Sequence, residues 1–254
     1  MVVSLPKLAA NLSLLFTELP FLERFAAAAA AGFRAVEYQF PYDVAADEIA
    51  ASARAAGVAV VLHNLPRGRD GEIGIAALPG REAEFEAGIE RAMAYAQAVG
   101  CPRLNCLAGC GGDLATFVAN LRVAAARLGA ADLALVIEAI STQAVPGFFL
   151  NRSAQAMEVI AQTGVDNLAL QYDCFHMQLM EGDLLTTIAR LLPQIGHIQI
   201  ADAPDRHEPG TGCIDYAHLL PTLDALGYSG YVGCEYLPAQ GTQAGLGWAA
   251  RWLA

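Results

Sequence analysis

The stretch "LALQYDCFHMQLMEGDLLTTIARLLPQIGHIQIAD", residues 168–202, decides the fold class of this chain. Two short apolar runs, residues 168–173 and 197–202, flank a segment whose apolar residues recur at helical spacing over 184–196. Each of the two short runs ends in an aspartate, which is typical of a buried strand that stops at a polar surface. The order strand, helix, strand predicts one unit of a parallel sheet.

The same alternation repeats along the rest of the chain. Strands are predicted at 11–16, 35–40, 58–66, 103–109, 133–139, 168–173, 197–202 and 231–236. Helices are predicted at 20–33, 45–57, 82–99, 114–131, 153–164, 184–196 and 216–227. Eight strands in 254 residues predict a single domain, residues 1–254, folded as a closed (β/α)₈ TIM barrel. A doubly wound open sheet is the alternative, but no GxGxxG follows the first predicted strand.

Composition argues against several classes of partner. The formal net charge is -11, so neither a nucleic acid nor an anionic membrane is an expected partner. Lys7 is the only lysine and precedes the first predicted strand, which argues against Schiff-base chemistry. The six cysteines form no CxxC pair, and the first residues resemble neither a secretory signal nor a membrane span. We expect reduced thiols and a cytoplasmic location.

Four oxygen-bearing side chains close four successive predicted strands. They are Glu138, Asp173, Gln199 and Glu235. The carboxyl ends of the strands of such a barrel meet on one face, and active sites of this fold lie there. Three carboxylates held close together repel one another unless a cation offsets them. The oxygen-rich set predicts Mg²⁺ or Mn²⁺, with Zn²⁺ and Co²⁺ as the other candidates.

Gln199 has two interpretations. A glutamine inside a core is costly unless both ends of its amide are hydrogen-bonded, so it is either a satisfied structural amide or a ligand. Beside three carboxylates, its neutral carbonyl oxygen would complete a metal shell, and the barrel prediction therefore favours the ligand.

Further polar residues are predicted near the same face. His176, Arg206 and His207 lie in predicted loops after ligand-bearing strands, where they could contact substrate or simply be solvated. Glu37, at the end of the second predicted strand, is a further candidate for substrate contact. His63 ends the third predicted strand, and it could either face the pocket or be a structural histidine. Arg67 and Arg69 could reach an anionic substrate, although solvated loop arginines are the simpler interpretation.

Several stretches together resemble a known family. "ANLSLLFTELPFLERF", "YDCFHMQLMEGDL", "GHIQIADAPDRHEPGTG" and "LDALGYSGYVGCEYLPAQGT" are similar, in order, to hydroxypyruvate isomerase and 2-oxo-tetronate isomerase, which are xylose-isomerase-like barrels. The resemblance implies a divalent metal held by Glu138, Asp173, Gln199 and Glu235. It also implies that Glu138 and Glu235 are the catalytic residues that give and accept protons.

The implied reaction converts hydroxypyruvate to tartronate semialdehyde (2-hydroxy-3-oxopropanoate) by proton transfer through a metal-stabilised enediolate. A 2-oxo-tetronate isomerase, a ketose 3-epimerase and a non-catalytic sugar-acid-binding barrel are the alternatives. An endonuclease on this barrel would need several zinc-binding histidines and a basic surface, and the five histidines and net charge of -11 argue against that class. The oligomeric state stays open, a homodimer included.

The chain departs from the family pattern beside the site. Where relatives resemble "EPINTRDIPGFFL", this sequence has "EAISTQAVPGFFL". Ala139, Ser141, Gln143 and Ala144 thus replace Pro, Asn, Arg and Asp. The loss of an arginine affects substrate recognition and leaves the four implied ligands in place.

Overall fold

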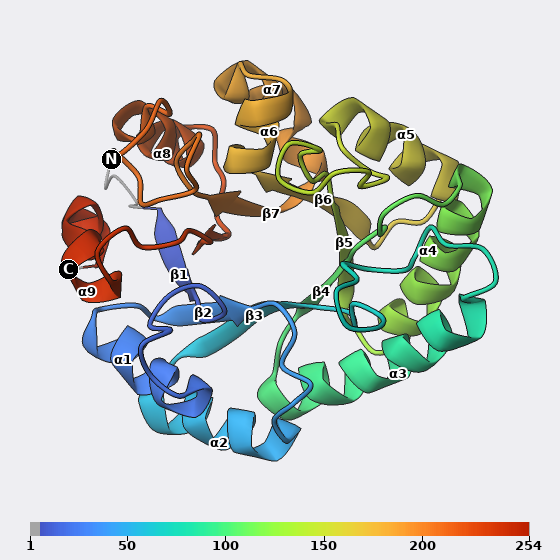
Figure 1. The fold of residues 1–254 in the computed structure, drawn as a ribbon, viewed down its shortest axis with the longest axis horizontal. Helices are drawn as coiled ribbons and strands as arrows, with labels where there is room; N and C mark the ends of the chain where they lie inside the picture. The colour runs from blue at the N-terminus through green and yellow to red at the C-terminus, as the bar shows by residue number, and fades with distance from the viewer. Residues whose placement is uncertain (1–5, 254) are drawn as a thin grey trace.

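The computed structural model describes residues 6–253, in which eight parallel strands close into a barrel in chain order (Figure 1). The strands are β1 (Lys7–Asn11), β2 (Ala35–Tyr38), β3 (Ala59–Asn64), β4 (Arg103–Cys106), β5 (Ala134–Glu138), β6 (Leu168–Asp173), β7 (Ile195–Ile200) and β8 (Tyr231–Cys234). Closure comes from β8, which pairs with β1 in parallel. The predicted TIM barrel is confirmed.

Helices form a ring around the strands (Figure 1). They are α1 (Arg24–Ala30), α2 (Ala46–Ala56), α3 (Glu82–Val99), α4 (Leu114–Gly129), α5 (Ser153–Thr163), α6 (Cys174–Met180), α7 (Leu184–Leu191), α8 (Tyr216–Ala225), α9 (Thr242–Gly245) and α10 (Ala250–Leu253). Short 3₁₀ turns at Phe21–Glu23, Leu192–Gln194 and Leu246–Ala249 adjoin α1, α7 and α10. Within residues 6–253, none of these helices combines the length and apolar character that a membrane crossing requires.

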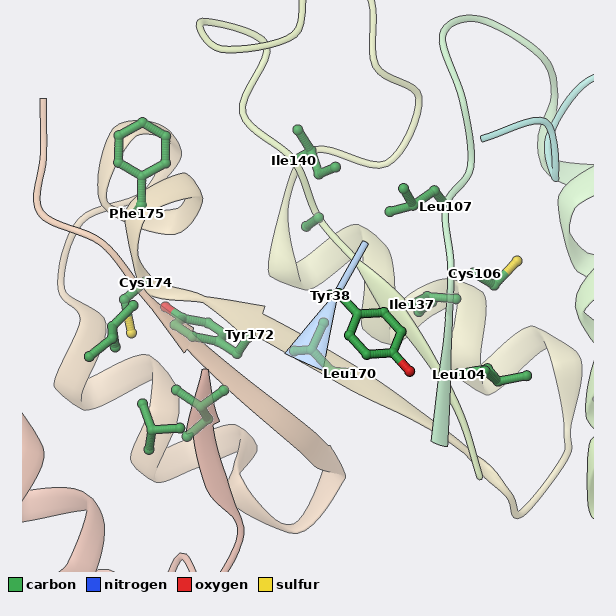
Figure 2. Packing of buried hydrophobic residues seen from close by; sticks show 14 of the residues in the cluster. Tyr38, Leu104, Cys106, Leu107, Ile137, Ile140, Leu170, Tyr172, Cys174 and Phe175 are labelled. Carbon is green, nitrogen blue, oxygen red and sulfur yellow. The ribbon is translucent and has the colours of Figure 1, made fainter. Parts of the chain in front are cut away.

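The main hydrophobic core includes apolar side chains from both the strands and the surrounding helices. Leu104, Ile137, Leu170 and Tyr172 belong to this buried cluster and come from three neighbouring strands (Figure 2). Helix residues such as Phe117 complete the layer. Packing of this kind fixes the strands in register, so that their carboxyl ends are held rigidly at one face.

The first strand is placed differently from its prediction at 11–16. It spans Lys7–Asn11, and the backbone N–H groups of Leu14 and Leu15 then turn back to the Asn11 carbonyl at 3.1 and 2.8 Å. Leu12 and Leu15 are fully buried in this turn. The apolar run therefore reflects a loop packed into the molecule, and Lys7 begins the strand instead of preceding it.

The sequence analysis also missed helices at two places. Residues 174–180, predicted as a loop, form α6, because the Asp173 carboxylate accepts from the backbone N–H groups of Phe175 and His176 at its start. An aspartate before a helix is a common N-terminal cap, and that signal was available in the sequence. The segments α9 and α10 follow β8, where no helix was predicted.

Candidate active site

Polar side chains gather where β5, β6, β7 and β8 end. Glu138 closes β5 and Asp173 closes β6, while Gln199 is next to last in β7 and Glu235 directly follows β8. All four are at least 95% buried. A cavity of about 330 Å³ opens above them, and its lining includes Glu138, Glu235, His176 and Arg206. The structure thus brings the predicted strand-end residues to one face.

Three of the buried groups lie close enough to share a cation. Glu138, Asp173 and His176 each offer a donor atom, and these atoms lie within 4.8 Å of one another. His176 Nε2 is 3.9 Å from Glu138 Oε1 and 3.7 Å from Asp173 Oδ2. The sequence analysis assigned His176 to substrate contact, and the structure adds it to the groups that could hold a metal.

The Asp173 carboxylate has one bonded oxygen and one free oxygen. Its Oδ1 accepts from the backbone N–H of Phe175 at 2.7 Å, which fixes the side chain at the start of α6. Its Oδ2 is buried and has no hydrogen-bond partner among residues 6–253. A buried, unpartnered carboxylate oxygen is costly unless something else binds it. A cation beside His176 and Glu138 would satisfy it, so the residues present fit a metal.

The local charges point the same way. Ionised Glu138, Asp173 and Glu235 would bring three negative charges into a buried space. Arg206 offsets one of them, since its Nη2 is 2.6 Å from Glu235 Oε2 and 3.8 Å from Asp173 Oδ2. Two negative charges are left, which is the charge that one divalent cation neutralises.

Burial shifts the ionisation of the same groups. Desolvation raises the pKa of Glu138 well above its ordinary value, and the nearby carboxylates of Glu235 and Asp173 raise it further. Desolvation likewise raises the pKa of Glu235, against the opposing effect of Arg206. For His176, desolvation lowers the pKa to about 4, so that its imidazole is neutral at pH 7. A neutral imidazole nitrogen is a competent metal ligand.

Both ends of the Gln199 amide are hydrogen-bonded. Its Nε2 donates to Glu37 Oε1 at 2.7 Å, and its Oε1 accepts from Gln171 Nε2 at 2.6 Å. This is the pattern expected of a structural amide. A carbonyl oxygen has a second lone pair, so the bond from Gln171 leaves room for a ligand role as well. The two interpretations of Gln199 are therefore compatible.

Gln199→Leu is expected to destabilise the metal-free protein by about 1–3 kcal/mol, because Glu37 and Gln171 each lose a buried partner. Urea unfolding in the presence of chelator measures this. Gln143→Leu is the matched control, since Gln143 is exposed and donates one bond to the Leu179 carbonyl. Equal stability of Q199L and Q143L would contradict the structural part of the assignment.

Glu37 lies inside the barrel, below the cavity, at the centre of a fully buried polar cluster. Its carboxylate accepts from Asn11 Nδ2 at 3.0 Å and from Gln199 Nε2, and it contacts His197 Nε2 at 2.6 Å. Gly233 on β8 leaves the space for it, because a Cβ there would lie 2.5 Å from the Glu37 carboxyl carbon. This cluster, which we name the Glu37 floor (Asn11, Glu37, His197, Gln199), supports the site from beneath.

Gly233→Ala is expected to destabilise the protein by about 1–3 kcal/mol, because the added methyl group overpacks the Glu37 floor. Thermal or urea unfolding measures the change. Gly247→Ala serves as the control, since a Cβ at Gly247 meets no atom within 4 Å. If the two variants unfold alike, Gly233 is not what makes room for the Glu37 carboxylate.

The structure places three residues predicted to contact substrate away from the cavity. Glu37 is in the floor, within β2 and covered by Gln199. His63 stacks on Tyr38 with ring centroids 5.9 Å apart, on the core side of β3, and burial lowers its pKa to about 4. His207 Nδ1 lies 2.7 Å from the Leu237 carbonyl. The cavity lining contains Asn64, the neighbour of His63, instead.

Sequence reasoning missed the amides that hold the carboxylates. Asn105 and Gln171 both donate to Glu138 Oε2, at 2.8 and 2.9 Å. Asn11 and Gln39 both donate to Glu235 Oε1, at 3.0 Å each. The available signal was the presence of polar residues inside short apolar strands, but the sequence analysis considered only polar residues at or near the strand ends.

Comparisons with known proteins agree with the fold. A family model described as "Xylose isomerase-like TIM barrel" matches residues 25–253. The chain is 46% identical over 258 residues to a 2-oxo-tetronate isomerase from Cupriavidus necator, covering 98% of this chain and 99% of that protein. It is also 46% identical over 251 residues to a hydroxypyruvate isomerase from Escherichia coli, covering 95% and 97%.

Among solved structures, one from Brucella melitensis, described as an AP endonuclease of family 2, matches with a TM-score of 0.95. It is 41% identical and covers 97% of this chain and 99% of its own. Fold and site thus define a xylose isomerase-like TIM barrel. Within that class, the chain belongs to the hydroxypyruvate isomerase and 2-oxo-tetronate isomerase family, and it is an isomerase.

Proposed function

We propose that this protein is a divalent-metal-dependent isomerase of a small hydroxy-oxo acid, with hydroxypyruvate and 2-hydroxy-3-oxopropanoate as the interconverted pair. In this reaction C3 of hydroxypyruvate loses a proton and C2 gains one, while the hydroxyl proton passes from O3 to O2. No oxidant or second substrate is needed, because the two carbons exchange oxidation states within one molecule.

The metal ligands in this proposal are Glu138, Asp173, Gln199 and Glu235, with His176 as a further donor that the structure suggests. The unpartnered Asp173 Oδ2 and the uncompensated charge of the site support this set. Oxygen donors favour Mg²⁺ or Mn²⁺, and the imidazole also suits Zn²⁺ or Co²⁺. When bound, such a cation supplies a Lewis acid that stabilises negative charge on substrate oxygens.

The single observation that carries the proposal is a pair of buried glutamates lining one cavity. Burial raises the pKa of Glu138 and raises that of Glu235 to about 7, which suits carboxyl groups that give and accept protons. In the proposal, one of them removes the C–H proton and the other returns a proton to the neighbouring carbon.

The surroundings of the two glutamates suit these roles. Asn105 and Gln171 hold Glu138 by Oε2, which leaves Oε1 for proton transfer. Glu235 is held at both oxygens, by Asn11 and Gln39 on one side and Arg206 on the other. We propose that His176 and Arg206, which line the same cavity, orient the oxygens of the substrate.

A second substrate is supported by a specific observation. The relatives named for 2-oxo-tetronate and for hydroxypyruvate are equally similar to this chain, at 46% identity each. The four-carbon acid undergoes the same proton transfer between adjacent carbons. An endonuclease is not favoured, because only His176 among the five histidines joins the candidate metal group and the net charge is -11.

The test is an NMR-monitored assay of the purified protein with Mg²⁺ or Mn²⁺ and either hydroxypyruvate or 2-oxo-tetronate. We expect interconversion with the isomer whose carbonyl has moved from C2 to C3, an aldehyde for hydroxypyruvate and a ketone for 2-oxo-tetronate, and loss of turnover on chelation. A ketose 3-epimerase would instead invert a ketose at C3 and leave both acids unchanged. Binding of the acids without any turnover would identify a non-catalytic barrel and overturn the proposal.

A further inference from the structure

Two arginines line the 330 Å³ cavity above the site, and they differ in how far they are neutralised. Arg206 has a side chain that is only 22% exposed and already paired, because it lies 2.6 Å from Glu235 and 3.8 Å from Asp173. Arg67 lies in the loop after β3, at the mouth of the cavity. Its side chain is 45% exposed, so an incoming ligand can reach it.

The partners of Arg67 are weak. Its Nη2 is 3.5 Å from Asp70 Oδ1, and the Asp70 side chain is fully exposed to solvent, so water screens the pair. Its guanidinium lies over the Phe40 ring, 5.8 Å from the ring centroid, and Phe40 lines the cavity as well. The aromatic ring thus positions the Arg67 guanidinium at the cavity without neutralising its positive charge.

The other carboxylate near this end of the cavity does not compete for Arg67. Glu72 lines the cavity, but both of its oxygens bind Arg81, at 2.9 and 3.1 Å. Arg69, two residues after Arg67, contributes its backbone N–H to the same carboxylate and does not line this cavity. Arg67 is therefore the cavity-lining guanidinium, among the described residues, that is least committed to a carboxylate.

The position at which relatives resemble arginine offers no substitute. Gln143 is exposed, its amide donates to the Leu179 carbonyl at 2.9 Å, and it does not line the cavity. A hydroxy-oxo acid carries a carboxylate beside its reacting carbons, and a planar guanidinium is the side chain best matched to bind it.

We propose that Arg67 binds the substrate carboxylate and makes this barrel select acids over neutral hydroxy-ketones. The inference rests on the proposed function for the identity of the substrate. It adds a recognition residue that lies on the β3–α3 loop and outside the metal and proton-transfer groups.

The test compares Arg67→Gln with Arg69→Gln in the full-length, Mn²⁺-loaded protein. Both changes remove one loop arginine, so they alter net charge equally. For R67Q we expect the KM for hydroxypyruvate and its calorimetric Kd to rise about tenfold or more. We expect a change of at most about twofold for R69Q and for the neutral analogue dihydroxyacetone with either variant.

A third variant tests whether Asp70 competes for Arg67. Because water screens that pair, Asp70→Asn should change the KM for hydroxypyruvate by at most about twofold. Equal KM values in R67Q and R69Q, or equal losses for acid and neutral ligand, would overturn the role of Arg67 while the isomerase assignment stands. Binding of hydroxypyruvate that weakens only in R67Q, in a protein without turnover, would support Arg67 and refute the proposed function.

Discussion

Asp173→Ala is expected to abolish isomerase activity and to weaken divalent-ion binding by more than about a hundredfold, because removing even an outer-shell partner of a ligand costs about 10–100-fold. The reason lies in the geometry of one carboxylate. Oδ1 is committed to the start of α6, and Oδ2 is buried beside His176 and Arg206 without a hydrogen-bond partner in the described part of the chain. The variant removes the oxygen that the site leaves open.

The barrel should stay folded, because losing a helix cap costs about 1 kcal/mol. Asp113→Ala is the matched control, since Asp113 caps α4 through the same kind of bond, to Thr116 N, and is exposed. Asp173→Asn retains an oxygen that can cap α6 and removes only the charge. Metal content by atomic emission and activity should fall in both Asp173 variants and not in D113A. Full activity of D173A after chelation and dialysis would refute the ligand assignment.

Running the isomerisation in D₂O should place deuterium on the product carbon that receives the proton, and Glu138→Gln or Glu235→Gln should each slow turnover by about 10²–10⁴-fold. A proton held on a glutamate exchanges with solvent, whereas a hydride shift carries hydrogen directly between carbons. A hydride shift assisted by a lysine is also not available at this site, because Lys7 is the only lysine of the chain. Lys7 begins β1 at the opposite end of the barrel and donates to the Ser229 carbonyl.

Proton NMR of the product at early turnover measures the label. Metal content must be measured for both glutamine variants, because each removes a proposed ligand as well as a proton carrier. Glu84→Gln, on the outer surface beside Arg81, controls for the loss of one glutamate. An unlabelled product in the unaltered enzyme would refute the two-glutamate mechanism, whatever the variants do.

The sequence predicted the parts of this molecule that depend on repeating patterns. Helix 82–99 and strand 168–173 have the predicted bounds, because each has a clear period and a clear end. Glu138, Asp173 and Glu235 could be found because a polar residue that ends an apolar strand is conspicuous. Parallel strands expose both faces to apolar surroundings, so the pattern leaves open which face a residue such as His63 takes.

Residues on the other strands were missed for a related reason. β2 and β3 pair with a register shift between Val36 and Glu37, which no local pattern reports. Such a shift affects whether the Glu37 side chain lines the cavity or lies below it, inside the barrel. The proposed role of Arg67 depends on how its loop lies over the mouth of the barrel, and that comes from tertiary packing.

The pairing of Glu37 with Gly233 constrains how this barrel can evolve. A side chain at 233 would overpack the Glu37 carboxylate, so the first accepted change is expected to shorten the side chain at position 37. That step leaves His197 and Gln199 without their shared acceptor. Lineages that keep the site intact are therefore expected to keep both residues together, whatever changes in the loops that select the substrate.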